Sequence, residues 1–367
     1  MANQFKKFFQ QYLDKKKIYV IAEAGVNHDG KISKAKKLIE MAKKAGANAI
    51  KFQTFTANDV VTKKAKKAKY QISNTKKQGS QYEMIKNLEL QHKDFIYLKK
   101  IAEKNKIDFI CSIFDNESLR FISLDLKSPI IKIPSGEITN YLLLKEIDYK
   151  KNYIFLSTGM SNMREVVDAI NCICKSKVFV IKSKKITILN KKLYNTVKKK
   201  LFIFHCVTDY PVEEKFANLN CINTLSEKLG LHIGYSDHTL GCVAPLVAIS
   251  KGAILIEKHF TLNKKSKGPD HLASLNPSEF QEMVIKIRKF ESMIGDGIKR
   301  LQKCELKNIK LVRKSIVARK SIKKNEIFKI ENLTVKRPGD GLSPFLIKRF
   351  INKKAKKDYY KDDFIKF

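Results

Sequence analysis

Eight short apolar runs, separated by longer amphipathic stretches, repeat along the first ~290 residues, and this alternation constrains the fold more than any other feature. The runs predict strands at residues 19–22, 49–52, 109–111, 130–133, 153–156, 201–206, 232–235 and 254–256. Helical patterns lie between them, for example at residues 32–45, 93–105, 163–174 and 244–251. Alternating strands and helices form parallel sheets, and eight strands close a barrel. An open doubly wound sheet is the alternative, but no glycine-rich dinucleotide fingerprint follows the first strand. The sequence therefore predicts an α/β protein with a (β/α)8 TIM barrel.

Three segments depart from this alternation. Residues 62–83 are polar and form a candidate loop over the mouth of the barrel. Residues 182–200 are rich in lysine and precede the sixth strand, so we expect them on the face opposite the mouth. After a helix predicted at residues 277–293, short alternating runs and turn residues take over. We therefore expect a barrel at residues 1–296, a linker at 297–313 and a small β-rich domain at 314–367.

Polar side chains follow all eight predicted strands. In chain order they are Glu23 with Asn27 and His28, Lys51 with Gln53, Ser112 with Asp115, Lys132 with Ser135 and Glu137, Ser157 with Thr158, His205 with Thr208 and Tyr210, Ser236 with Asp237 and His238, and Glu257 with Lys258 and His259. The active site of a (β/α)8 barrel is built at the carboxyl ends of its strands. A barrel that served only as a scaffold would not need such convergence, so the sequence predicts an enzyme.

Two lysines among these residues indicate a site for a small polyanion. Lys51 and Lys132 would supply fixed positive charge, and a single lysine near a strand end would more often lie on the surface. Neutral hydrogen-bond donors accompany them, namely Ser112, Ser135, Ser157 and Ser236.

Two histidines close neighbouring strands and predict a divalent-metal site. His238 and His259, backed by Asp237 and Glu257, could hold an ion with open positions for water and substrate. Taken singly, each histidine fits a structural role equally well. His271 fits a further ligand, a substrate contact or an ordinary loop residue.

Two carboxylates follow apolar strands and are candidates for acid–base chemistry. Glu23 and Glu137 could act as general acid or base, or could bind sugar hydroxyls. The competing interpretation makes them buried ion-pair partners of the two lysines.

The chain is strongly basic, with 74 Lys and Arg against 36 Asp and Glu and a formal net charge of +38. Such a charge suits nucleic-acid binding. Lysine is nevertheless spread along the whole chain, and no aromatic RNA-binding box, helix-turn-helix signature or zinc-finger spacing accompanies it. We therefore interpret the charge as a solvated surface that can also steer anionic substrates.

Several features favour a cytoplasmic protein. No run approaches the ~20 apolar residues of a membrane span, and residues 1–17 lack the unbroken apolar core of a signal peptide. The seven cysteines show no metal or redox spacing, and we expect reduced thiols.

An ordered set of motifs covering residues 17–365 resembles the sialic acid synthase family. The motifs are IAEAGVNHDG (21–30), KFQTF (51–55), KIPSGEITN (132–140), LSTGM (156–160), HCVTDYP (205–211), GYSDHT (234–239), IEKHFTL (256–262), GPDH (268–271) and VKRPGDG (335–341). The family includes synthases of N-acetylneuraminate, N,N′-diacetyllegionaminate and pseudaminate. The resemblance implies a TIM barrel followed by an antifreeze-like (SAF) domain, a domain-swapped homodimer, and a divalent metal, with Mn²⁺ favoured and Mg²⁺ or Co²⁺ as alternatives.

The same resemblance implies roles for individual residues. The phosphoenolpyruvate site would consist of Lys51, Ser112, Lys132, Ser135, Ser157 and Ser236, and the metal ligands would be His238 and His259. Glu23, Gln53, Glu137 and Tyr210 would surround the amino-sugar acceptor, with Asp237 as a further substrate-binding residue. Arg337, which on sequence alone looks like a surface residue, would bind the acceptor's N-acyl end from the partner subunit.

Alternatives from other functional classes stay open on the sequence. A metal-dependent barrel aldolase or hydrolase could use similar residues, and a nucleic-acid-binding protein would use the charge. The acceptor is also undecided between N-acetylmannosamine and a 2,4-diacetamido-2,4,6-trideoxyhexose.

Overall fold

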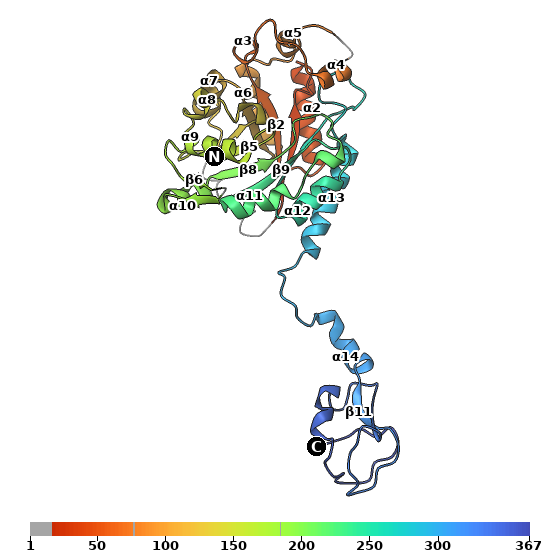
Figure 1. The fold of residues 1–367 in the computed structure, drawn as a ribbon. Coiled ribbons are helices and arrows are strands. Elements are labelled where there is room, and N and C mark those ends of the chain that lie inside the picture. The colour runs from red at the N-terminus through yellow and green to blue at the C-terminus, as the bar shows by residue number, and fades with distance from the viewer. Residues whose placement is uncertain (1–16, 76–77, 184) are drawn as a thin grey trace. The chain divides into compact units, whose positions relative to one another are not determined.

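A closed barrel of eight parallel strands forms the centre of the larger part of the protein (Figure 1). The structure is a computed structural model that describes residues 17–75, 78–183 and 185–367. The barrel strands are β1 (Tyr19–Gly25), β2 (Ala49–Thr54), β3 (Asp108–Ile113), β4 (Ile130–Ile133), β5 (Tyr153–Ser157), β8 (Leu201–His205), β9 (His232–Asp237) and β10 (Leu255–His259). Their order around the barrel is β1-β10-β9-β8-β5-β4-β3-β2. The predicted barrel is confirmed. Residues 1–16, which belong to the segment in which we expected no signal peptide, lie outside the described residues.

Helices surround the barrel and join its strands. They are α2 (Ile32–Lys44), α6 (His92–Lys104), α7 (Asn116–Arg120) with a π-helical turn (Phe121–Asp125), α8 (Tyr141–Leu144), α9 (Met163–Ile173), α11 (Cys221–Leu229), α12 (Val243–Ser250) and α13 (Pro277–Met293). The sequence fixes several of their starts: Asn162 and Asn276 cap α9 and α13, and Glu165 and Glu279 complete the two capping boxes. None of the helices in the described residues is long and apolar enough to cross a membrane.

Two apolar layers hold the barrel together. Aromatic and aliphatic side chains such as Tyr19, Phe155 and Phe202 fill its interior, while a larger cluster packs between the strands and the helices. This packing leaves the carboxyl ends of the strands for polar groups. The strand register brings those ends together, because Glu23 is level with Lys51 of β2 and with His259 of β10.

The segment between β2 and α6 covers the mouth of the barrel. We predicted a loop at residues 62–83, but short helices form around and within it: α3 (Ala57–Val60), α4 (Lys69–Thr75) and α5 (Gln81–Lys86). The Asn74 side chain donates hydrogen bonds to the carbonyls of Tyr210 (3.2 Å) and Pro269 (2.6 Å), which ties α4 to loops that follow β8 and β10.

The lysine-rich excursion before β8 folds into an antiparallel hairpin and a helix. These are β6 (Phe179–Lys182), β7 (Lys185–Ile188) and α10 (Lys191–Lys198). The Tyr194 hydroxyl donates to the carbonyl of Gly230, just before β9 begins. The excursion therefore lies beside the starts of the strands, away from α3–α5, as Figure 1 also shows.

The chain divides after Ile294 into two compact units. The second contains η4 (Lys303–Glu305), α14 (Leu306–Val312), η5 (Pro344–Arg349) and a two-stranded antiparallel sheet of β11 (Ser315–Ala318) and β12 (Leu333–Lys336). Isolated bridges and turns make up most of the rest, so this unit has less strand than we expected. The segment that we predicted as a linker contains α14.

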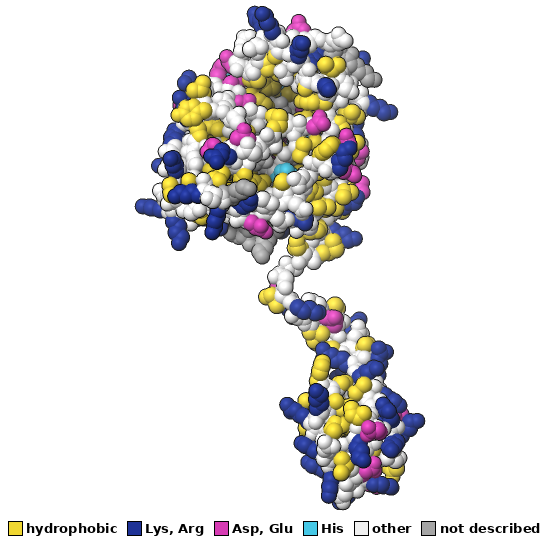
Figure 2. Space-filling view, viewed as in Figure 1, with side chains coloured by type: hydrophobic (Ala, Val, Ile, Leu, Met, Phe, Trp, Pro, Cys, Tyr) yellow, Lys and Arg dark blue, Asp and Glu magenta, His cyan; other side chains and the backbone are white. Residues whose placement is uncertain are grey.

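Charged side chains are dispersed over the surface. Lysine and arginine are scattered across the visible face of each unit in Figure 2 and do not gather into one stripe. This distribution favours the interpretation of the positive charge as a general surface property. All seven cysteines are free thiols, as expected.

Candidate active site

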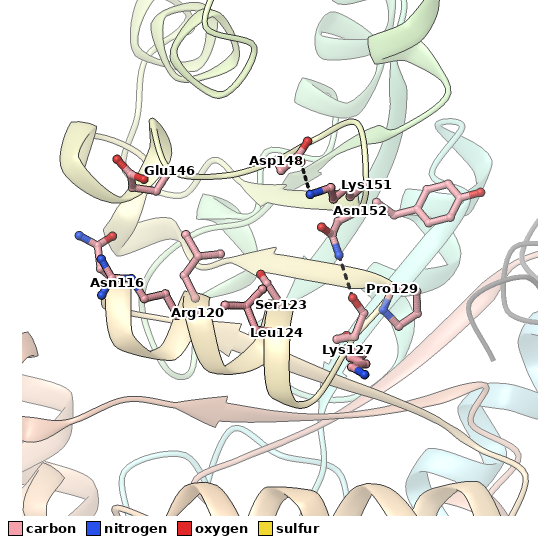
Figure 3. Close-up of a pocket in the computed structure, with 13 residues that line it drawn as sticks. Asn116, Arg120, Ser123, Leu124, Lys127, Pro129, Glu146, Asp148, Lys151 and Asn152 are labelled. Atoms are coloured by element: carbon pink, nitrogen blue, oxygen red, sulfur yellow. Dashed lines mark hydrogen bonds and ion pairs between the residues drawn. The ribbon is translucent and has the colours of Figure 1, made fainter.

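A cavity of about 330 Å³ opens at the carboxyl ends of the strands. Gln53, Glu137, Tyr210 and His259, all predicted site residues, line it, together with side chains from α3–α5. A second cavity, of about 360 Å³, lies near the starts of β4 and β5 and is lined by none of the predicted site residues (Figure 3). We therefore place the active site in the first cavity.

A network of buried charges lies at the base of this site. Lys51 Nζ is 2.8 Å from Glu23 Oε2 and 3.6 Å from Glu257 Oε1, and it donates to Ser112 Oγ at 2.9 Å. Lys132 Nζ lies 3.2 Å from Glu257 Oε2 and 3.7 Å from the centre of the Phe204 ring. The four charged side chains are almost fully buried. Burial of this many ionisable groups is costly and is typical of functional sites.

The two carboxylates of the network differ in acidity. Burial, outweighing Lys51, raises the pKa of Glu23 to about 7, and nearby Glu257 adds to the rise. Burial acts in the same direction on Glu257, but Lys132 and Lys51 overcome it and lower the pKa of that carboxyl to about 2. Glu257 is therefore the permanent anion between the lysines, while Glu23 can exchange a proton near neutral pH.

The serines predicted to bind an anion lie at or just beyond the ends of their strands. Ser112 accepts from Lys51, and Ser236 donates its hydroxyl hydrogen to Glu257 at 2.8 Å. Ser135 Oγ is 2.9 Å from Thr208 Oγ1. Ser157 is buried at the end of β5.

The two predicted metal ligands lie close together, with their rings edge-on to each other. The rings of His238 and His259 lie 5.3 Å apart, and Tyr210 is 4.2 Å from the first and 5.5 Å from the second, between centroids. His238 Nδ1 is 2.5 Å from the carbonyl of Val207, and donation there would make Nε2, 3.4 Å from Ser236 Oγ, the unprotonated nitrogen. Burial lowers the pKa of His238 to about 4 and holds that of His259 well below its usual value. Neutral imidazoles are the form that binds a metal.

The donor atoms of His238 and His259 suit a metal site with two protein ligands. His259 Nδ1 is buried and has no hydrogen-bond partner, which leaves its lone pair available to a metal ion. In the part of the chain that the structure describes, no group of three or more histidine, cysteine or acidic side chains could hold an ion. His271 is not a third ligand, because Asp29 (2.9 Å) and the Thr261 hydroxyl (2.6 Å) occupy its two nitrogens. Water or substrate would complete the coordination.

Other predicted site residues fall into three groups. Gln53 and Glu137 border the cavity. Gln53 donates a hydrogen bond to Glu23 at 3.1 Å, and Glu137 accepts one from Asn140 at 2.7 Å. Asp237 behaves differently: its oxygens accept hydrogen bonds from Tyr235 in β9, Thr239 just after β9 and Lys258 in β10, which does not support a substrate-binding role. Arg337 is exposed in the second unit, where it donates to the Val312 carbonyl at 3.0 Å.

Sequence reasoning missed two carboxylates in this site. Glu257 was noted only as a neighbour of the histidines, yet it pairs with both lysines. Asp270 was passed over in favour of His271, yet its Oδ2 lies 3.8 Å from His259 Nδ1, and burial raises its pKa to about 6. The GPDH motif contains both Asp270 and His271, and only the three-dimensional structure shows that Asp270 is the one that lines the cavity.

Comparison with known proteins identifies the family of the chain. The sequence profile of the NeuB family matches residues 38–299, and that of the SAF domain matches residues 313–367. The chain belongs to the NeuB family. The predicted family resemblance and C-terminal SAF domain are thus confirmed, and the family generally uses a divalent metal.

Relatives in the NeuB family and a solved structure cover most of the chain. N,N′-diacetyllegionaminic acid synthase of Campylobacter jejuni is 44% identical over 351 residues, 96% of this chain and 99% of the relative. Pseudaminic acid synthase of the same species is 33% identical over 352 residues, 96% of each chain. The structure of N-acetylneuraminic acid synthetase from Leptospira borgpetersenii matches with a TM-score of 0.65 and 30% identity, over 80% of this chain and 91% of that one.

Proposed function

We propose that this NeuB-family enzyme condenses phosphoenolpyruvate with a 2,4-diacetamido-2,4,6-trideoxyhexose and releases phosphate. The family makes the chain a nonulosonic acid synthase with phosphoenolpyruvate as one substrate. The buried Lys51–Glu23–Glu257–Lys132 network beside two neighbouring histidines carries the proposal. The acceptor class is supported by the 44% identity to the legionaminic acid synthase.

The lysines and serines would hold the phosphate and carboxylate of phosphoenolpyruvate. An incoming trianion would compete with Glu23 for Lys51, and a proton on Glu23 would relieve the repulsion. The fixed hydroxyls and ammonium groups would then keep the enol carbon facing the acceptor.

His238 and His259 would hold the divalent metal, for which Mn²⁺ is our first choice and Mg²⁺ or Co²⁺ are alternatives. When bound, the ion supplies Lewis acidity for the acceptor's aldehyde oxygen. Carbon-3 of phosphoenolpyruvate attacks the aldehyde carbon, the aldehyde oxygen takes up a proton, and carbon-2 becomes electron-deficient. Water adds at carbon-2 and loses a proton, and phosphate leaves from the resulting tetrahedral carbon, which becomes the ketone. Glu137, or Glu23 once its own proton has passed to the aldehyde oxygen, would accept the proton of the attacking water.

Phosphate release and product mass test this function. The enzyme, phosphoenolpyruvate and Mn²⁺ would be incubated with trideoxyhexoses of different ring configuration and with N-acetylmannosamine. We expect phosphate together with a nine-carbon acid from a trideoxyhexose. Cleavage of a sugar without use of phosphoenolpyruvate would instead indicate an aldolase or hydrolase.

The metal assignment has its own prediction. His238→Ala and His259→Ala should each abolish turnover and should lower the metal that the purified protein retains, measured by elemental analysis. His232→Ala, at the start of β9 away from the site, is the control. Full activity of the double His238→Ala/His259→Ala variant would overturn the assignment.

We further propose a domain-swapped homodimer in the cytoplasm, with Arg337 of each chain serving the partner's site. This rests on family resemblance alone, and its test is given in the Discussion.

A further inference from the structure

One side of the cavity consists of residues at and beyond the strand ends, with polar groups such as Gln53, Glu137, His259 and Asp270 beside apolar ones such as Phe55. The other, which we call the apolar wall, consists of Val60, Val61, Met84, Ile85 and Leu88, from α3, α5 and the residues that follow them.

The helices that carry the apolar wall bury few of their own residues. Helix α5 buries none of its residues, and α3 buries only Ala57. The five side chains of the wall are half-buried and line the cavity. Apolar groups held at a cavity in this way favour an apolar ligand surface.

Hydrogen bonds outside the cavity hold the wall in place. The Tyr82 hydroxyl donates to Asn58 Oδ1 at 2.7 Å, joining α5 to α3, and the Ala57 amide donates to Glu89 at 3.1 Å. Ser80 caps α5 by accepting from the Glu83 amide. The wall therefore does not need the ligand in order to form.

The polar residues on this side of the cavity already have partners. The side-chain oxygen of Gln71 accepts from the Ala68 amide at 2.9 Å and lies 3.5 Å from the Gln81 nitrogen, while the Gln71 nitrogen lies 3.4 Å from the Tyr70 hydroxyl. The five apolar side chains themselves offer no donor or acceptor, so a sugar hydroxyl packed against them would lose its hydrogen bonds to water.

We propose that the apolar wall selects the acceptor, by packing against the 6-deoxy methyl and an acetamido methyl and by disfavouring a 6-hydroxymethyl group. This rests on the proposed function, since it assigns part of the same cavity to one end of the acceptor. The difference between a methyl and a hydroxymethyl group in an apolar pocket changes the ratio of kcat/KM values on the order of 10–200-fold.

The test compares two acceptors in two wall variants. Val61→Thr keeps the size of the side chain and replaces one methyl group by a hydroxyl, and Ile85→Asn places an amide in the wall. Each should lower the kcat/KM ratio of the trideoxyhexose over N-acetylmannosamine by roughly 10-fold or more. The KM for phosphoenolpyruvate, which we place at Lys51 and Lys132, should not move, whereas general damage to the fold would change it.

A matched control separates the wall from the surrounding segment. Ile72→Asn makes the same substitution as Ile85→Asn in neighbouring α4, at a 42% exposed side chain that does not line the cavity, and the ratio should stay at its original value. An unchanged ratio in both folded wall variants, or an equal change in Ile72→Asn, would overturn the inference. Absence of phosphate release with every sugar in the native enzyme would instead defeat the proposed function.

Discussion

Glu257 balances part of the positive charge of the two buried lysines, Lys51 and Lys132. It pairs with Lys132 at 3.2 Å and with Lys51 at 3.6 Å, and its low pKa keeps it anionic. Glu23, with a pKa of about 7, pairs with Lys51 alone. Without a ligand the site is therefore close to neutral, and a bound phosphoryl group would take the place of carboxylate contacts.

Replacement of Lys132 tests this arrangement. Lys132→Met should lower kcat/KM for phosphoenolpyruvate by on the order of 100-fold, because a buried, preorganised charge is lost. The measurement is the rate of phosphate release against phosphoenolpyruvate concentration. Lys200→Met is the control: this lysine also lies over an aromatic ring, 4.6 Å from that of Tyr153, but before the start of β8. Equal losses in the two variants would contradict the assignment of Lys132.

The types of residue at the strand ends predicted the site, but only the three-dimensional structure shows which carboxylate pairs with which lysine. We left open whether Glu23 and Glu137 were catalytic groups or partners of the lysines. The structure separates them, since Glu23 contacts Lys51 whereas Glu137 accepts from Asn140. Contacts between strands far apart in sequence decide such pairings, and a single sequence carries no record of them.

Among the elements, the loop after β5 shows how backbone shape positions Ser135, which we propose binds phosphoenolpyruvate. Gly159 has a φ of +45°, and a Cβ there would collide with Ser135 and Thr208. Gly159→Ala should cost about 1–2 kcal/mol in backbone strain, and it should raise the KM for phosphoenolpyruvate by displacing Ser135. Gly252→Ala shares the positive φ (+99°) but has open space around it, so it should lower the melting temperature without a change in KM. A normal KM in Gly159→Ala would contradict this.

A partly buried carboxyl at the start of β3 makes stability depend on pH. Burial raises the pKa of Asp108, in β3, to about 6, and its carboxylate accepts a hydrogen bond from the Tyr19 hydroxyl of β1. Between about pH 4 and 6 the folded state keeps this proton and the unfolded state loses it, so stability falls as pH rises. The loss is at most about 3 kcal/mol, because one pKa unit is about 1.4 kcal/mol and the group keeps some solvent contact.

Calorimetric melting of Asp108→Asn checks this effect. The variant cannot ionise, so it should gain melting temperature relative to the native protein as pH rises from 4 to 7.5. A constant difference between the two proteins across that range would contradict the prediction.

Strand positions were largely predictable, whereas strand ends and the mouth were not. The run at 130–133 coincides with β4, and that at 232–235 finds the start of β9, which continues to Asp237. Strands are held by backbone hydrogen bonds, so they extend into polar residues that an apolar pattern leaves out. Helices α4 and α5 were missed for a related reason. Ser80 caps α5, side-chain hydrogen bonds join α5 to α3 and α4, and neither α4 nor α5 has much apolar periodicity.

At the scale of the whole molecule, the proposed exchange of SAF domains makes a prediction about mixed dimers. A chain with His259→Ala and a chain with Arg337→Ala should each be inactive alone. After unfolding and refolding together, they should recover roughly a quarter of native activity, because one site of each mixed dimer combines an intact barrel with the partner's Arg337. The measurement is phosphate release before and after mixing. No recovery in mixed dimers isolated with two different tags would show that Arg337 acts within its own chain.

The hairpin β6–β7 and helix α10 lie beside the strand starts, on the side away from the mouth, and several of their residues are exposed. Length and sequence can change at such a place with little consequence for chemistry. The hairpin is therefore a practical attachment point for a fluorophore or an affinity peptide. A label there would report on assembly and solution behaviour while the enzyme turns over normally.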